Sequence, residues 1–309
     1  MYRFNKNAVV CFLGDSITAR AKWVCRIMDY YRENVPGSTL KAITCGRPGG
    51  NATVAIKRMV SDLYPYNPTD VVIMFGMNDI CRQLYICEKV TEEILNDRTK
   101  VLKEYEVALR TIGEELTKRG AKLIFCTPTP TDVNQINGTP YLPGTLVGLK
   151  KTSEIVKKVA ADFGGHVVDF YQEFGDMIEL LREENPYNNI VSVDTVHPNE
   201  TGEEVMANIF LKAQGFDLPL YDKMADWEKQ RAKPFSAYVK RFFEIAGIQG
   251  KIAFVQWSIL RNVPEDKFKE TIAEEYKDTA PGEFRYGCLE GYEKHISKKE
   301  EYMQELINM

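Results

Sequence analysis

The stretch AVVCFLGDSITAR, from Ala8 to Arg20, decides the fold of this chain. Its apolar first half, Ala8 to Leu13, is typical of one buried strand, and a helical pattern follows over 22–31. The turn Gly14-Asp15-Ser16 separates the two, so Ser16 lies where a strand gives way to a helix. In an open α/β sheet the carboxyl ends of the strands border the ligand crevice, and Ser16 would face that crevice. The pattern alone also fits a serine that only caps a helix.

The alternation of buried strands and amphipathic helices continues along the chain. Apolar strand patterns recur at Leu40 to Thr44, Val71 to Gly76, Leu123 to Cys126 and His166 to Phe170. Helical patterns lie between them at Thr53 to Leu63, Thr99 to Arg119 and Leu149 to Phe163. Short, nearly continuous apolar strands separated by helices predict a parallel sheet covered on both faces, which is a three-layer α/β/α sandwich.

The alternation stops near Gly215, and helical patterns follow. Apolar residues recur at helical spacing from Phe235 to Ala246, between Pro234 and Gly247. Shorter stripes of the same kind follow at Phe268, Ile272 and Tyr276, and at Tyr292, Ile296, Met303, Leu306 and Ile307. We therefore predict an α/β domain over 1–215 and a helical subdomain over 216–309, which packs on the sandwich, caps its cleft or makes an oligomer contact.

Composition and charge narrow the function classes. The 309 residues are 44% hydrophobic and 27% charged, with a formal net charge of −4, as in an ordinary soluble globular protein. This charge gives no reason to expect nucleic acid or an anionic membrane as a partner, and a small neutral substrate fits better.

Targeting and cysteine signals indicate a cytoplasmic protein. The N-terminal MYRFNKNAVV lacks the long uncharged segment of a signal peptide, and no apolar run approaches the roughly 18 residues that span a bilayer. The seven cysteines form no CxxC pair, and several lie inside apolar runs, so we expect reduced, buried thiols.

Two further loops follow predicted strands. The glycine-rich turn Thr44 to Asn51 lets the backbone approach a ligand, although ordinary tight turns look the same. It has neither the Lys-Ser/Thr ending of a P-loop nor the spacing of a dinucleotide site. Gly76-Met77-Asn78-Asp79 could turn the Asn78 amide into the same crevice, or could simply end the strand with an Asx-turn.

The segment Asp194-Thr195-Val196-His197-Pro198 carries the pattern of a general base. A carboxylate three residues before an imidazole can accept the bond from Nδ1 and leave Nε2 free. The chain has three histidines, and we interpret His166 and His295 as structural because neither has this arrangement. No cluster of His, Cys and carboxylate positions suggests a metal site, so we expect neither metal nor cofactor.

These four segments, in this order, resemble the blocks of the SGNH hydrolases, the GDSL-type esterase and lipase superfamily. The resemblance covers residues 8 to about 213 and implies a flavodoxin-like sandwich. It makes Ser16 of GDSIT the nucleophile, Asn78 of GMND an oxyanion-hole residue, and His197 of DTVH the base with Asp194 as its partner.

The glycine block fits the family pattern N-x-G-x-x-G-x-T least well, because it begins with Thr44. An ungapped comparison makes Gly49 the oxyanion glycine, beside the Ser16 amide and Asn78, and a shift of one residue gives Gly50. We adopt Gly49. The residues Asp15 and Asp79 are expected to brace the two turns. Candidates for substrate contact, from the turns and the long connections, are Asp15, Gly50, Arg82 and Tyr141.

The family resemblance implies a serine esterase that works through an acyl-enzyme. Polar and aromatic residues on the connections Ile80 to Arg98 and Thr127 to Gly148 suit a short-chain O-acetyl ester, carbohydrate esters among them, although solvated loop side chains look the same. A lipase, thioesterase or arylesterase of the same fold is an alternative. A non-catalytic sugar-binding or scaffold protein is a second alternative, from another class. A homo-oligomer is compatible with either.

Overall fold

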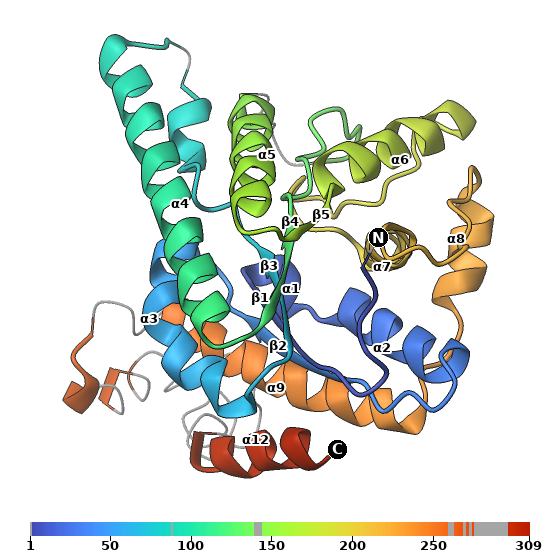
Figure 1. Cartoon of the computed structure of the whole chain (residues 1–309). Helices are drawn as coiled ribbons and strands as arrows, with labels where there is room; N and C mark the ends of the chain where they lie inside the picture. The colour runs from blue at the N-terminus through green and yellow to red at the C-terminus, as the bar shows by residue number, and fades with distance from the viewer. Residues whose placement is uncertain are drawn as a thin grey trace.

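Five parallel strands form the centre of the structure, a computed structural model that describes residues 2–87, 89–138, 144–258, 263–267, 270–271, 274 and 296–309 (Figure 1). The strands are β1 (Val9–Gly14), β2 (Lys41–Gly46), β3 (Asp70–Met74), β4 (Lys122–Cys126) and β5 (His166–Val168). All neighbours pair in parallel, in the order β2-β1-β3-β4-β5. The predicted three-layer α/β/α sandwich with a flavodoxin-like sheet is therefore confirmed.

Helices cover both faces of this sheet (Figure 1). One face carries α3 (Ala52–Asp62), α4 (Glu92–Lys118) and α5 (Thr145–Asp162). The other carries α2 (Lys22–Asn34), α6 (Phe170–Glu184) and α7 (Glu200–Ala213). Short helical turns lie between these elements: α1 (Ser16–Ala19), η1 (Tyr64–Tyr66) and η2 (Arg82–Tyr85).

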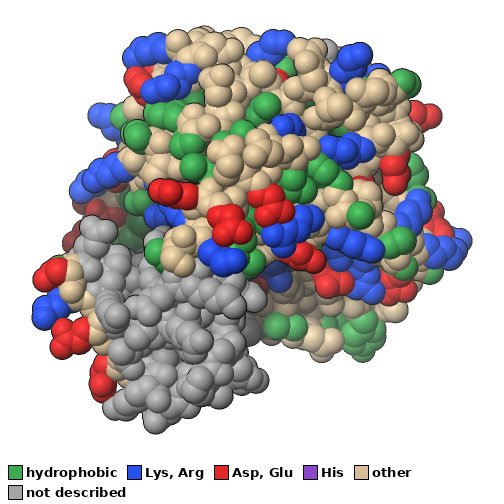
Figure 2. Space-filling view, turned by 90° about the horizontal axis from the view of Figure 1, so that it is seen from below, with side chains coloured by type: hydrophobic (Ala, Val, Ile, Leu, Met, Phe, Trp, Pro, Cys, Tyr) green, Lys and Arg blue, Asp and Glu red, His purple; other side chains and the backbone are tan. Residues whose placement is uncertain are grey.

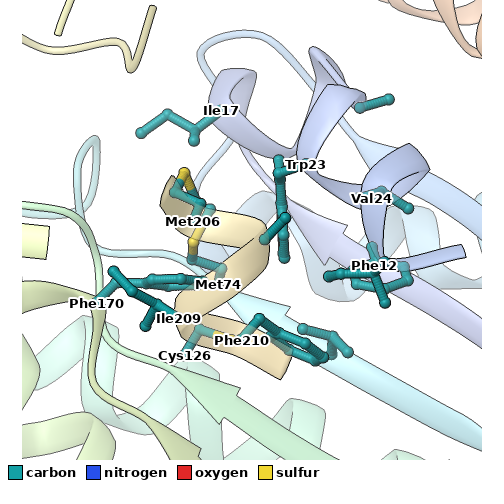
Figure 3. Packing of buried hydrophobic residues seen from close by; sticks show 14 of the residues in the cluster. Phe12, Ile17, Trp23, Val24, Met74, Cys126, Phe170, Met206, Ile209 and Phe210 are labelled. Carbon is teal, nitrogen blue, oxygen red and sulfur yellow. The ribbon is translucent and has the colours of Figure 1, made fainter. Parts of the chain in front are cut away.

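Alternate side chains of β1 enter two separate cores, which explains its unbroken apolar run. Cys11 and Leu13 pack toward α3, α4 and α5, whereas Val10 and Phe12 pack toward α2 and α7. In this second core the rings of Phe12 and Trp23 meet edge to face, with 5.3 Å between their centroids (Figure 3). Burial on both faces of a strand is what a parallel sheet requires, and it fixes the strand against which the nucleophile turn is built.

Two helices differ from the sequence-based expectation. Helix α4 begins at Glu92, not at Thr99, because the Thr91 side chain accepts a bond from the Ile94 amide and Glu92 and Glu93 suit the first turn. Its first turns are largely exposed and carry no apolar stripe, so periodicity does not reveal them. Helix α6 was not expected. It begins at Phe170, where the last strand was expected to end, with Asp169 as its cap.

The C-terminal helices pack on the sandwich. Helices α8 (Met224–Arg231), α9 (Ala237–Ser258) and α12 (Lys299–Asn308) follow the α/β part, together with the short turn η3 (Glu265–Lys267). Helix α9 contacts α1, α2 and the edge strand β2, and α12 packs on α9 (Figure 1). The predicted stop at Gly247 is wrong, because α9 continues through this glycine to Ser258 while packed against the sandwich.

Some sequence features fall outside the described residues. These are the stripe members Phe268, Ile272, Tyr276 and Tyr292, together with Cys288. Within the described helix α12, the predicted apolar position Leu306 is buried. The proposed boundary near residue 215 stays a prediction, although side chains of α8 and α9 belong to the same core as Phe12.

The surface is mixed in charge. Figure 2, which views the molecule from the side of α9 and α12, shows basic and acidic side chains interspersed on the visible face. Among the described helices, none is both long enough and apolar enough to cross a membrane. The six cysteines in the described ranges are free thiols, of which Cys11, Cys25, Cys45 and Cys126 are buried as expected, whereas Cys81 is exposed.

Candidate active site

Three side chains from opposite ends of the α/β part form one hydrogen-bonded set. The hydroxyl oxygen of Ser16 lies 2.8 Å from Nε2 of His197. Nδ1 of the same imidazole lies 2.6 Å from a carboxylate oxygen of Asp194. Because a carboxylate can only accept, Nδ1 carries the proton, and Nε2 is left to accept from the serine hydroxyl.

The local sequence forces the tight turn that carries Ser16. Strand β1 ends at Gly14, where a Cβ atom would lie 2.1 Å from the Thr18 hydroxyl oxygen and 2.8 Å from the Met74 carbonyl oxygen. Only glycine fits there. The next residue, Asp15, accepts a 2.9 Å bond from the Ile17 amide and so caps α1, with Ser16 as its first residue.

Asp15 is the brace of this turn. Its side chain is 2% exposed, and burial raises the pKa of its carboxyl to about 7; the nearby Arg82 and Arg58 charges oppose that rise. The expectation that Asp15 braces the nucleophile agrees with this position. The expectation that Asp15 contacts substrate does not agree with this position, because the carboxylate is buried and accepts its bond from within the turn.

The Asp194 carboxylate organises the loop that carries the imidazole. Its second oxygen accepts bonds from the amides of Val196 and His197, each at 3.0 Å. Burial acts to raise the pKa of Asp194, but these bonds and the imidazole together hold it below its ordinary value. The His197 carbonyl also accepts a 2.7 Å bond from the Ser192 amide, so the loop is closed on itself.

Asn78 lies beside the glycine turn. Its side-chain amide donates a 2.9 Å bond to the Gly50 carbonyl. The neighbouring Asp79 accepts bonds from the amides of Ala52 and Gly76, at 2.8 Å and 2.9 Å. Burial raises the pKa of Asp79 to about 6 against the effect of these bonds. Asp79 therefore orders the turn that presents Asn78, as expected, and also ties it to the start of α3.

The two candidate oxyanion glycines differ in their contacts. The Gly50 amide donates a 2.9 Å bond to the Arg47 carbonyl within the turn, and its own carbonyl faces Asn78. Gly49 adopts the left-handed backbone (φ 66°), and within the part of the chain described here its amide has no acceptor. The assignment of Gly49 as the oxyanion donor stays a prediction.

The remaining substrate candidates are placed unevenly. Arg82 lies on η2, half-buried, near enough to Asp15 for its charge to lower that carboxyl's pKa. Tyr141 lies outside the described residues. On the connection after β4, Gln135 donates to the Val191 carbonyl and Asp132 pairs with Arg182. The suggestion that this connection suits a sugar ester stays a prediction.

Arg58 supports the site and was missed by the sequence reasoning. Its guanidinium is buried, and it donates to the carbonyls of Gly14 and Cys45 at 2.9 Å and 2.7 Å. It therefore joins the ends of β1 and β2, from which the nucleophile and glycine turns start. Its spacing to Asp62, an i,i+4 ion pair at 3.1 Å, was the only local signal. Within the described ranges, no group of His, Cys and carboxylates could hold a metal ion.

A serine bonded to an imidazole that is bonded to a carboxylate, at the carboxyl ends of a parallel sheet, defines a serine hydrolase site. The sequence comparisons agree with this class. Residues 12–205 match the model of the GDSL-like Lipase/Acylhydrolase family. The chain belongs to this family, within the SGNH hydrolase superfamily, and is an acylhydrolase.

Several relatives are similar in sequence or structure. An acetylxylan esterase of Geobacillus stearothermophilus is 24% identical over 221 residues, which are 67% of this chain and 93% of that protein. Among solved structures, the match to a gut microbial diltiazem-metabolizing enzyme covers 100% of this chain and 95% of that enzyme's chain, with a TM-score of 0.75 and 16% identity. The match to the structure of an acetyl xylan esterase covers 66% of this chain and 98% of that esterase's chain, with a TM-score of 0.54 and 21% identity.

The esterase of G. stearothermophilus has also been solved as catalytic mutants. In these a serine, a histidine, or an aspartate three positions before that histidine is replaced by alanine. The share of this chain that each match covers distinguishes the comparisons, because the acetylxylan esterases cover 66–70% of it, whereas the diltiazem-metabolizing enzyme covers all of it.

Proposed function

We propose that this protein is a serine esterase that hydrolyses short-chain esters, acetyl esters first among them, by way of an acyl-enzyme. The observation that carries the proposal is the continuous set of bonds from the Ser16 hydroxyl through His197 to Asp194. The aspartate lies three positions before the histidine, the same spacing as in the catalytic mutants of the acetylxylan esterase.

In the first half of the reaction, the Ser16 oxygen attacks the ester carbonyl as His197 Nε2 takes the hydroxyl proton. Asp194 keeps Nδ1 protonated and stabilises the imidazolium. The carbonyl oxygen becomes an oxyanion, for which the Ser16 amide, the Asn78 side chain and the Gly49 amide are the proposed donors. When the C–O bond breaks, the imidazolium gives its proton to the leaving alcohol.

In the second half, water attacks the acyl-enzyme. Nε2 of His197 accepts a proton from the water, and the same donors hold the second oxyanion. Breaking the acyl–Ser16 bond returns the proton to the serine oxygen and releases the carboxylic acid. Every proton is moved by one imidazole, so the reaction runs without a cofactor.

The acyl and alcohol groups are the finer part of the proposal. The similarity to acetylxylan esterases supports an acetyl group, and an acetylated saccharide is one proposed substrate class. The whole-chain likeness to a diltiazem-metabolizing enzyme supports testing diltiazem beside the saccharides. A cytoplasmic location and a homo-oligomeric state are likewise proposals from the sequence.

The test is hydrolysis of p-nitrophenyl esters from acetate to long acyl chains by the wild type and Ser16→Ala. We expect activity on acetate that falls with chain length and disappears in Ser16→Ala. The matched control Ser61→Ala removes an exposed hydroxyl on α3 and should keep wild-type activity. Equal activity of Ser16→Ala and wild type would refute the proposal, and activity confined to long chains would favour a lipase.

A non-catalytic binding protein is tested by labelling with an organophosphonate. Covalent attachment at Ser16 requires a serine activated by its imidazole, which a binding protein has no need to keep. Attachment that disappears in His197→Ala would exclude the binding function. A second comparison, of acetylated xylooligosaccharides with acetylated phenols, then decides the class of alcohol.

A further inference from the structure

Ser16 and His197 lie on segments far apart in sequence, and their 2.8 Å contact requires these segments to keep one relative position. Two main-chain bonds close the histidine loop, residues 190–199, on itself. The Ser192 amide donates to the His197 carbonyl at 2.7 Å, and the Asn199 amide donates to the Ile190 carbonyl at 3.0 Å. Neither bond reaches the nucleophile segment, so neither fixes the distance between hydroxyl and imidazole.

Arg20 makes a contact that crosses between the two segments. It stands at the end of α1, the single helical turn that begins with Ser16. Its Nη1 atom donates a 3.0 Å bond to the carbonyl of Pro198, the residue directly after His197. One guanidinium therefore joins the end of the nucleophile helix to the backbone beside the base.

Glu203 orients this guanidinium from the first turn of α7. One carboxylate oxygen lies 3.8 Å from Nε of Arg20, and the other accepts bonds from the amides of Lys22 and Trp23 at 2.9 Å and 3.2 Å. These amides begin α2, whose N-cap Ala21 is in the left-handed conformation (φ 62°) and offers no side-chain acceptor. Glu203 thus supplies from another helix the cap that α2 lacks.

The corner formed by Arg20, Glu203 and the start of α2 is anchored in the core. Trp23 is fully buried and meets Phe12, Phe170 and Phe210 edge to face, as Figure 3 shows around the α7 helix. Glu203 is 4% exposed, and burial raises the pKa of its carboxyl to about 7 while Arg20 and the two amides oppose that rise. Arg20 itself is accessible, with 44% of its side chain exposed.

We propose that Arg20, oriented by Glu203, is a positioning residue that sets the distance between the Ser16 hydroxyl and the His197 imidazole. It touches neither the reacting atoms nor the triad side chains directly. It acts by holding the Pro198 carbonyl, and with it the imidazole, against the end of α1. Displacing a catalytic group by about 1 Å can cost on the order of 100-fold in rate, so one bond of this kind is enough to matter. The inference rests on the proposed function.

The test compares Arg20→Ala and Arg20→Lys with the wild type. Because the arginine side chain is partly exposed, we expect Arg20→Ala to fold with a Tm close to that of the wild type. Its kcat should fall about 10- to 100-fold with KM within about twofold, and organophosphonate labelling of Ser16 should slow by the same factor. Arg20→Lys keeps a charged donor and should recover part of the rate.

Added guanidinium chloride at millimolar concentration should restore part of the activity of Arg20→Ala, whereas equal sodium chloride should not. A merely structural role of Arg20 would not give this rescue. The matched control is Lys22→Ala, which removes a cation at the same corner that pairs with Glu200 at 3.5 Å. It should keep the wild-type kcat.

Three results would overturn the inference. They are a wild-type kcat in Arg20→Ala, a raised KM at unchanged kcat, and a loss of activity that only follows a lowered Tm without guanidinium rescue. Failure of the proposed function itself is recognised separately, because Ser16→Ala would then be as active as the wild type. An inactive Ser16→Ala beside a fully active Arg20→Ala would leave the proposed function standing and remove only the positioning role.

Discussion

The side-chain amide of Asn78 donates a 2.9 Å hydrogen bond to the main-chain carbonyl of Gly50. This bond fixes the amide plane and leaves its second N–H for an oxyanion. Asn78→Ala should therefore lower kcat about 100- to 1000-fold with little change in KM, because the donor acts on charge that appears in the transition state. Steady-state kinetics with p-nitrophenyl acetate measure both constants.

Asn78→Asp is the informative companion variant. It keeps the shape of the side chain but replaces the N–H donor with an acceptor that repels an oxyanion. We expect it to be at least as impaired as Asn78→Ala above neutral pH. A variant of either kind with near-wild-type kcat would remove Asn78 from the oxyanion hole.

Asp194→Asn tests the orientation of the base. An asparagine oxygen can still accept from the amides of Val196 and His197, so the loop should stay folded. It neither stabilises an imidazolium nor enforces the tautomer with the proton on Nδ1, and we expect kcat to fall about 1000- to 10,000-fold. Asp226→Asn, an exposed carboxylate change on α8, is the control and should be silent. Loss of less than about threefold in Asp194→Asn would contradict the triad.

The triad could be predicted from sequence because each member is a chemically reactive residue next to a strand end or a helix start. Ser16 follows an apolar strand, and Asp194 and His197 are close together in sequence, so their pairing is a local matter. The parallel sheet with helices on both faces followed from the same alternation, and its flavodoxin-like form was implied by the family resemblance. The side chains that hold these parts together are harder to recognise in the sequence.

Arg58, Arg20 and Glu203 could not be predicted, because their partners are main-chain groups of other elements. A guanidinium that binds the carbonyls of Gly14 and Cys45 looks, in sequence, like any exposed helical arginine. Glu203 caps a helix that begins 181 residues earlier. Only tertiary structure brings such partners together, whereas the start of α4 was missed for a local reason, namely the absence of an apolar stripe over its first turns.

Asp15 should make stability depend on pH. Its pKa is about 7 in the folded protein and 3.8 in its ordinary state, mainly because it is buried. A raised carboxyl pKa favours the folded state below about pH 4, and this contribution is lost as pH rises toward 7. Asp15→Asn removes the titrating carboxyl, and the asparagine side-chain oxygen can still accept a bond from the Ile17 amide.

The free energy of unfolding of Asp15→Asn should therefore rise relative to that of the wild type between pH 4 and pH 7.5. Three units of pKa correspond to about 4 kcal/mol, which is the upper limit of the effect. Urea unfolding at several pH values measures it. A difference between the two proteins that stays constant over this range would show that Asp15 is not held with a raised pKa.

Two adjacent phenylalanines on α9 test whether the C-terminal helices share the core of the α/β part. Phe242 is 1% exposed and belongs to the cluster that contains Phe12, whereas Phe243 is 37% exposed. Phe242→Ala should destabilise the protein by about 3–5 kcal/mol. Activity and the helical signal should then be lost together, in one unfolding transition with a lowered midpoint. Phe243→Ala, the same change one position later, should cost far less. If Phe242→Ala instead melts part of the helical signal while the activity keeps its wild-type midpoint, then α9 unfolds on its own and 216–309 is a separate folding unit, as a domain boundary near residue 215 would require.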